Sequence, residues 1–270
     1  MRKIVDANCL SDPILEEYLK SNQGNMAVLT EFAGMEAYKG DPVKNICQSL
    51  KVLCRYPRQV IILKGARQII RENQTPNGLN VEVFIDEDQT KHFSESCYVI
   101  KQAEEGNPEA IMAIKERGRQ ATEEMERLRR DAIKVAQGIV AISKTFDPNH
   151  LRILRRHDPI PEALGDKIIK DILIQSALII RDHPDMNQVP TAGELRNTYI
   201  FRYSLCCYLL VLDWLEKGGL NNSNVEKIRN DLIDMSYAAY STCFDGILSK
   251  DVKLNRIYEI AIYFLEHVFV

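Results

Sequence analysis

The sequence predicts an α/β fold, because strand-like and helix-like segments alternate at both ends of the chain. A first strand is expected at residues 3–5, and Asp12-Pro13 is typical of the start of the helix that follows. A second strand is expected at residues 26–29, and Thr30 can cap the next helix. The N-terminal part therefore reads as strand, helix, strand, helix.

The C-terminal part of the chain shows the same kind of alternation. A long helix is expected over residues 192–217, and another over about 222–242. A short strand at 247–249 and a last helix over 254–266 follow. Together with the N-terminal elements, these segments predict one α/β core.

The segment between the two ends is expected to be mostly helical. It contains strand-like runs at 60–63 and 81–85. Helical spacing recurs over three later stretches: 108–142, 150–156 and 165–181. A segment of about 140 residues fits an appended module better than a loop. We therefore expect a core built from 1–45 and 190–270, with residues 46–189 inserted into it.

The composition is typical of a globular, non-secreted protein. Apolar residues make up 45% and charged residues 27% of the 270 residues, which argues against a disordered chain. The N-terminus lacks the apolar stretch of a signal peptide, and the most apolar run, 205–212, is too short to cross a bilayer. Seven scattered cysteines without a C-x-x-C pair favour neither a disulfide framework nor a zinc site. We expect a cytoplasmic protein without membrane association.

Acidic residues fall where an α/β fold gathers functional groups, at the carboxyl ends of strands. Asp6 and Asp251 follow the first and last predicted strands, and Glu36 comes shortly after the second. Asp231 and Asp234 are three residues apart, so a helix holds their charges on one face. Hard oxygen ligands of this kind suit Mg²⁺ or Mn²⁺, which support phosphodiester hydrolysis. The alternative interpretation is that each acid is a helix cap or a solvated surface charge.

The same acids carry a resemblance to a known family. The runs I-V-D-A-N, V-L-T followed by M-E-A-Y-K-G, and N-D-L-I-D-M-S-Y-A-A-Y-S-T-C-F-D-G-I-L-S-K-D together resemble the acidic signature of PIN-domain ribonucleases. The resemblance covers roughly 1–45 and 190–265, and the long insertion departs from the family pattern. It implies a three-layer PIN-like core with a central parallel sheet. It also implies hydrolysis of RNA phosphodiesters with Mg²⁺ or Mn²⁺.

The resemblance also assigns roles to individual residues. Four acids would be catalytic and would bind the metal ion: Asp6, Glu36, Asp234 and Asp251. Asp231 is a further metal-binding candidate by its position, and Asn8 and Ser249 match polar positions that support the first and last Asp. Glu31 competes with Glu36 for the second acidic position.

Charge is unevenly distributed along the chain. The overall net charge of −3 argues against a non-specific nucleic-acid binder, but the predicted core contains thirteen basic and seventeen acidic residues, and the insertion 22 and 21. Residues 51–71 include six basic residues and no acid. Lys64, Arg67 and Arg71 would share one face of a helix, where they can neutralise RNA phosphates. A solvated helix face is the alternative interpretation.

Two further arginines are candidates for RNA binding. Arg196 and Arg202 occupy neighbouring helical positions with Tyr199 and Tyr203, so the group can grip a phosphate or stack on a base. Aromatic residues at helical spacing can equally belong to the core.

The sequence thus predicts a Mg²⁺- or Mn²⁺-dependent endoribonuclease whose insertion serves RNA recognition or regulation. The resemblance to PIN toxins and defence nucleases favours structured RNA, tRNA first, and implies an antitoxin or regulatory partner and self-association. A catalytically inactive RNA-binding or scaffolding protein of the same fold is the alternative. A third hypothesis is a metal-independent ribonuclease, since Arg152 and His157 resemble the R-x4-6-H pattern of HEPN enzymes.

Overall fold

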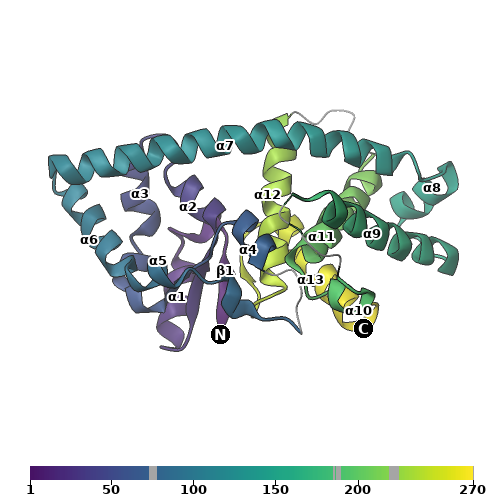
Figure 1. Cartoon of the computed structure of the whole chain (residues 1–270), viewed down its shortest axis with the longest axis horizontal. Helices are drawn as coiled ribbons and strands as arrows, with labels where there is room; N and C mark the ends of the chain where they lie inside the picture. The colour runs from purple at the N-terminus through teal and green to yellow at the C-terminus, as the bar shows by residue number, and fades with distance from the viewer. Residues whose placement is uncertain (73–77, 185, 187–189, 219–224, 270) are drawn as a thin grey trace. The chain divides into compact units, whose positions relative to one another are not determined.

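The structure is a computed structural model that describes residues 1–72, 78–184, 186, 190–218 and 225–269 (Figure 1). This part of the chain contains a four-stranded, all-parallel sheet and thirteen α-helices, which confirms the predicted α/β class. None of the helices described is both long and apolar enough to span a membrane.

The chain forms two compact units. The first comprises Met1–Ile69, Asn80–Arg127 and Cys243–Asn255 and contains the whole sheet. The second comprises Ile70–Leu79, Leu128–Thr242 and Arg256–Val270. Both units draw on segments that are distant in sequence, and their boundaries differ from those expected for the core and the insertion.

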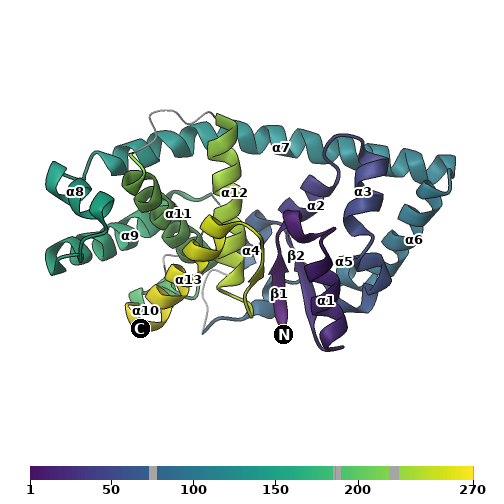
Figure 2. The same ribbon diagram turned by 180° about the vertical axis from the view of Figure 1, so that it is seen from behind.

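The sheet has the strand order β3-β2-β1-β4. β1 (Arg2–Val5) pairs on one side with β2 (Met26–Leu29) and on the other with β4 (Ile247–Leu248), as Figure 2 shows for β1 and β2. The three strands predicted at the two ends of the chain are confirmed, with small shifts at their ends. Their side chains are largely buried, as expected for parallel strands that read as continuous apolar runs.

The fourth strand comes from the segment that the sequence assigned to the insertion. β3 (Val60–Ile62) pairs with β2 in parallel, so the expected boundary after residue 45 does not separate the sheet from the insertion. The polar β segment expected at 81–85 is instead a 3-10 helix, Val81–Phe84, and Ile85 forms an isolated antiparallel bridge with Leu63. The apolar run at 60–63 is therefore part of the core.

Helices follow the strands at the positions where capping residues occur. Asp12 accepts a hydrogen bond from the Ile14 amide at 3.0 Å, and Thr30 accepts one from the Ala33 amide at 3.2 Å. In the described residues, six α-helices lie between β1 and residue 104: α1 (Pro13–Ser21), α2 (Glu31–Ala37), α3 (Pro42–Leu50), α4 (Ala66–Glu72), α5 (Glu87–Lys91) and α6 (Phe93–Glu104). The long helix predicted next is confirmed as α7 (Pro108–Ser143), which contributes residues to both units.

The remaining helices occupy the C-terminal half of the sequence. They are α8 (Pro148–Arg156), α9 (Glu162–Asp182), α10 (Ala192–Leu195), α11 (Tyr199–Glu216), α12 (Val225–Ser241) and α13 (Val252–His267). In the second unit, α11 packs against α8, α9 and α12. The start expected for α12, at 222–223, lies outside the described residues.

The long helix predicted over 192–217 is wrong as one continuous element. The chain leaves the helical conformation at Thr198, whose side chain caps α11 by accepting a hydrogen bond from the Phe201 amide at 3.2 Å. A capping box between Thr191 and Glu194 likewise opens α10. The local hydrogen bond to Thr198 therefore divides a segment whose apolar spacing is continuous.

Candidate functional site

The order of the strands marks one point on the sheet where a site is expected. β2 and β3 continue the sheet on one side of β1, whereas β4 lies on its other side, so the strand order reverses between β1 and β4. In open parallel sheets, ligands bind outside the carboxyl ends of the strands at this point. Asp6 follows β1 directly, and Ser249 and Asp251 follow β4.

Backbone pairing holds Asp6 beside the end of β4. The Asp6 amide donates to the Leu248 carbonyl at 3.0 Å, which continues the β1–β4 ladder by one residue. The Asp6 side chain is 6% exposed, and its Oδ2 accepts a hydrogen bond from the Ser249 hydroxyl at 2.5 Å. This short contact fixes the orientation of the carboxylate.

Ser249 also positions the second acid. The Asp251 amide donates to Ser249 Oγ at 3.0 Å, and Asp251 Oδ1 accepts from the Leu254 amide at 2.8 Å at the start of α13. The carbonyl of Ser249 accepts from Asn255 Nδ2 at 2.9 Å. One serine therefore joins the first and last acids of the predicted set.

Burial and like charge shape the electrostatics of this pair. Burial is the main cause that raises the pKa of Asp6, and the negative charge of Asp251 raises that pKa further. The Ser249 hydrogen bond acts in the opposite direction by stabilising the carboxylate. A bound cation would relieve both the burial and the repulsion, so the donor chemistry of Asp6 and Asp251 fits a hard divalent ion.

The loops after the two strands are tied together around this pair. Asn8 Oδ1 accepts from the Lys250 amide at 3.4 Å and from the Cys9 thiol at 3.1 Å. The Lys250 side chain forms an ion pair with Asp12, which lowers the pKa of that carboxyl group. Burial and the charges of Asp6 and Asp12 raise the pKa of Cys9 to about 11, so Cys9 stays a neutral thiol. Sequence reasoning found Asn8 but missed Lys250, whose partner is distant in the chain.

The two glutamates of α2 differ in their surroundings. Glu31 Oε1 accepts from the Ala66 amide at 2.9 Å, at the first turn of α4, and burial raises the pKa of Glu31. A Cβ atom on Gly65 would lie 2.7 Å from Glu31 Oε2, so the backbone at Gly65 is packed against this carboxyl group. Glu36 is half-buried one turn later on α2, which packs against the 3-10 helix Ala7–Cys9 directly after Asp6. Glu31 thus contacts the first turn of α4, and the choice of Glu36 over Glu31 as the second acid stays a prediction.

The remaining two acids belong to the second unit. Asp231 is 5% exposed, and its Oδ2 accepts from the Trp214 indole at 3.0 Å, which links α11 to α12. Asp234 is half-buried in the middle of α12. The association of Asp231 and Asp234 with Asp6 stays a prediction.

The metal-binding set is not complete in the residues that the structure describes. Among them, no three His, Cys, Asp or Glu side chains form a group that could hold a metal ion. The sheet edge supplies two carboxylates, Asp6 and Asp251. Mg²⁺ commonly keeps several waters and is bound through one or two carboxylates, so two carboxylates are enough ligands for such an ion.

Of the five basic residues predicted to bind RNA, two are exposed, and the other three donate hydrogen bonds to backbone carbonyl groups. Arg67 and Arg71 are exposed on α4, whereas Lys64 is half-buried and donates to the Val83 carbonyl at 3.0 Å. Arg196 donates to the Phe269 carbonyl at 2.8 Å.

Arg202 is placed in the core rather than on an RNA-facing surface. Its side chain is 7% exposed and donates to the Arg196 carbonyl at 2.9 Å and to the Thr242 carbonyl at 2.6 Å. Tyr199 is buried as well, and its ring stacks on that of Tyr240 with a centroid distance of 4.5 Å. Arg202 and Tyr199 therefore belong to the core, which is the alternative interpretation of this segment.

The Arg152 and His157 pair of the third hypothesis flanks the end of α8. Arg152 donates to the Asn149 side chain at 2.7 Å, and His157 ends the helix in a left-handed conformation with φ of 53°. Both side chains are exposed.

No family model, no curated protein and no solved structure matches the chain.

The opposite pKa shifts of two neighbouring aspartates give a stability prediction. Above its raised pKa, Asp6 destabilises the fold, because the unfolded chain ionises it more easily. Asp6→Asn should therefore raise the midpoint of thermal unfolding at pH 7, and this gain should vanish as the pH falls to the ordinary Asp value of 3.8. Asp12→Asn should lower the midpoint at pH 7, because the pKa of Asp12 is depressed by Lys250. Calorimetry across this pH range measures both effects, and a destabilising Asp6→Asn would contradict the electrostatic description of the site.

Proposed function

We propose that the chain is a Mg²⁺- or Mn²⁺-dependent endoribonuclease with a three-layer PIN-like core. The observation that carries the proposal is the juxtaposition of Asp6 and Asp251, joined by Ser249, at the point where the strand order reverses. A structural role alone explains this arrangement poorly, since burying one carboxylate near another costs stability.

The residues of the proposed ion site would have separate roles. Asp6 and Asp251 would hold the ion, and Ser249 would keep both in position through its hydroxyl oxygen. When bound, the ion would lower the pKa of a water molecule and neutralise charge that develops on the scissile phosphate. Burial of Asp6 limits competing hydration of its carboxylate, which strengthens its attraction for a cation. Glu36 is the candidate for the third acid, and Asp231 and Asp234 complete the set that we propose.

RNA is the proposed substrate, with a structured RNA such as tRNA as the first candidate. The exposed Arg67 and Arg71 on α4 supply cations for phosphate binding in a chain with a net charge of −3. By the resemblance to PIN toxins and defence nucleases, we further propose a cytoplasmic protein with a regulatory partner and self-association. An inactive RNA-binding protein is the second candidate, favoured by the incomplete metal-ligand group among the described residues.

Cleavage of purified total RNA tests the enzymatic proposal. Wild-type protein with Mn²⁺ should cleave, and EDTA should stop it. Asp6→Asn and Asp251→Asn should each lower the rate roughly 100-fold or more, because groups that only support a metal ligand already contribute 10- to 100-fold. Asn retains the capping ability of Asp251, so the fold should persist. Glu17→Gln is the matched control, since Glu17 is an exposed acid on α1.

Each other outcome has a defined meaning. Cleavage that persists in EDTA and in both Asn variants contradicts metal catalysis and points to Arg152 and His157. RNA binding without cleavage under any of these conditions favours the inactive RNA-binding protein.

A second pair of variants identifies the third acid. Glu36→Gln should lower the cleavage rate as strongly as Asp6→Asn, because we assign Glu36 to the metal site. Glu31→Gln should retain most activity, because a glutamine oxygen can still accept the Ala66 hydrogen bond. Initial rates at saturating Mn²⁺ measure the difference, and the reverse result would assign the third position to Glu31.

A further inference from the structure

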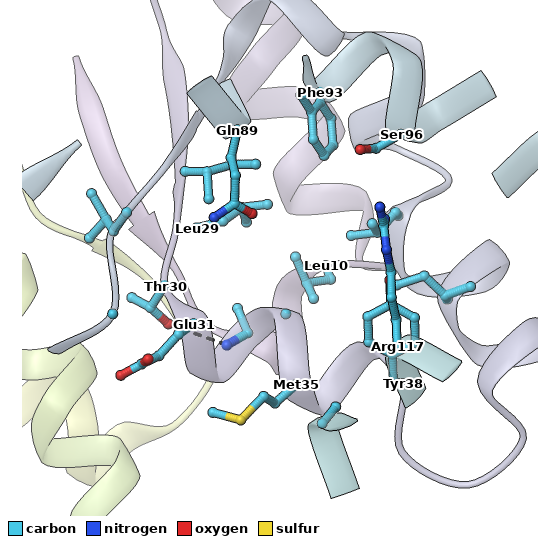
Figure 3. Close-up of a pocket in the computed structure, with 18 of the residues that line it drawn as sticks. Leu10, Leu29, Thr30, Glu31, Met35, Tyr38, Gln89, Phe93, Ser96 and Arg117 are labelled. Carbon is cyan, nitrogen blue, oxygen red and sulfur yellow. Dashed lines mark hydrogen bonds between the residues drawn. The ribbon is translucent and has the colours of Figure 1, made fainter. Parts of the chain in front are cut away.

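A pocket of about 450 Å³ lies in the first unit at the carboxyl ends of β2 and β3 (Figure 3). Its walls are largely apolar and include Leu10, Leu29, Ile62, Phe93 and Ile100. The size and the apolar lining are those of small-molecule sites in proteins. Because β1 and β2 are parallel neighbours, the pocket and Asp6 share one edge of the sheet.

One end of this pocket carries three polar side chains that have no partner within the part of the chain that the structure describes. Tyr38, Ser96 and Arg117 line it, and none of their side-chain polar atoms makes a hydrogen bond or ion pair with the residues that the structure describes. Figure 3 shows the Arg117 guanidinium directed toward Ser96, and the Tyr38 ring at the base of the Arg117 side chain in this view. By contrast, Arg119 on the same helix is paired with Glu116 and Glu123.

These three side chains suit an anionic group. A guanidinium and two hydroxyls supply charge-assisted and neutral hydrogen bonds to phosphate oxygens. Two acids also line the pocket, and each has another partner: Glu31 accepts from the Ala66 amide, and Glu124 is paired with Arg127. In Figure 3 the Glu31 carboxyl group points away from Arg117. Among the described residues neither acid is paired with Arg117, which leaves its guanidinium as the cationic group at this end of the pocket.

The rest of the pocket suits a flat ring with a polar edge. Leu29, Ile62 and Phe93 offer apolar faces against which a ring can pack. Gln89 lines the same wall, and its Nε2 donates to Asp86 at 2.8 Å. Its carbonyl oxygen accepts from none of the described groups, which leaves an acceptor for the N–H of a base.

We infer that this pocket binds a nucleotide, with its phosphate at Arg117, Ser96 and Tyr38 and its base between the apolar walls. The inference rests on the proposed function, since an RNA strand with one base in the pocket would run along the sheet edge that carries Asp6. The same chemistry would be met by a nucleotide of the RNA or by a free mononucleotide.

Binding measured by titration calorimetry in EDTA tests the inference independently of cleavage. AMP, GMP, CMP and UMP are titrated one at a time, and the matching nucleosides serve as controls without phosphate. At least one mononucleotide should bind with a Kd below about 1 mM, and its nucleoside should bind at least about tenfold more weakly. Absence of binding by all four mononucleotides and by the RNA tetranucleotide described below would overturn the inference.

Two variants and their matched controls locate the site. Arg117→Gln should weaken mononucleotide binding about tenfold or more, whereas Arg119→Gln should leave it unchanged. Gly34→Phe should block the pocket, because Gly34 lines it and a Cβ there meets no atom within 4 Å. Gly165→Phe is its control, since Gly165 is a helical glycine with equal space outside the pocket. Wild-type affinity in both Arg117→Gln and Gly34→Phe would place the nucleotide elsewhere.

A competing RNA tetranucleotide separates the two sources of the ligand. Competition with the mononucleotide assigns the pocket to RNA, and its absence assigns the pocket to a free nucleotide. Nucleotide binding without Mn²⁺-dependent cleavage counts against the proposed function alone. Cleavage by a protein that binds neither ligand counts against the pocket alone.

Discussion

The parallel pairing of β1 with β4 is the constraint on which the candidate site depends. It joins residues from the two ends of the chain, with Ile4 opposite Ile247 and Val5 opposite Leu248. The Asp245 amide also donates to the Arg2 carbonyl at 2.9 Å. Only through this pairing does Ser249 reach Asp6. A slip of one residue would turn the side chains after both strands to opposite faces and separate the two acids.

This arrangement combines a stabilising ladder with a destabilising pair of charges. β4 is only two residues long, yet it ends in a loop that is held by hydrogen bonds with Asn8, Ser249 and Asn255. The same loop holds Asp251 close enough to raise the pKa of a buried carboxyl group. Sites that oppose stability in this way are expected where a ligand later supplies the compensating charge.

The sequence predicts the local parts of this fold well. Strands at both ends and the caps at Asp12 and Thr30 depend on nearest neighbours in the chain, which apolar runs and turn residues reveal. The membership of β3 in the sheet is not local, because an apolar run at 60–62 is equally compatible with a separate module. The break before α11 depends on a threonine hydrogen bond that apolar spacing does not reveal.

The candidate site is likewise predictable from the sequence only where it depends on local features of the chain. Asp6, Ser249 and Asp251 could be found because each lies at a strand end, where the fold class gathers side chains. The burial of Arg202 and the hydrogen bond from Trp214 to Asp231 depend on tertiary packing, which a helical pattern of charges and aromatics does not encode. The pocket beside Phe93 and Arg117 is also tertiary, since α2, α6 and α7 all contribute to it.

Binding of Mn²⁺ in the absence of RNA is the most direct measurement of the central claim that Asp6 and Asp251 form a cation site. Electron paramagnetic resonance detects free Mn²⁺ and therefore gives the affinity of the wild-type protein and of each variant. Saturable binding should weaken at least about tenfold in Asp6→Asn and in Asp251→Asn and stay unchanged in Glu17→Gln. Equal affinity in all four proteins, or no saturable binding by the wild type, would contradict the claim.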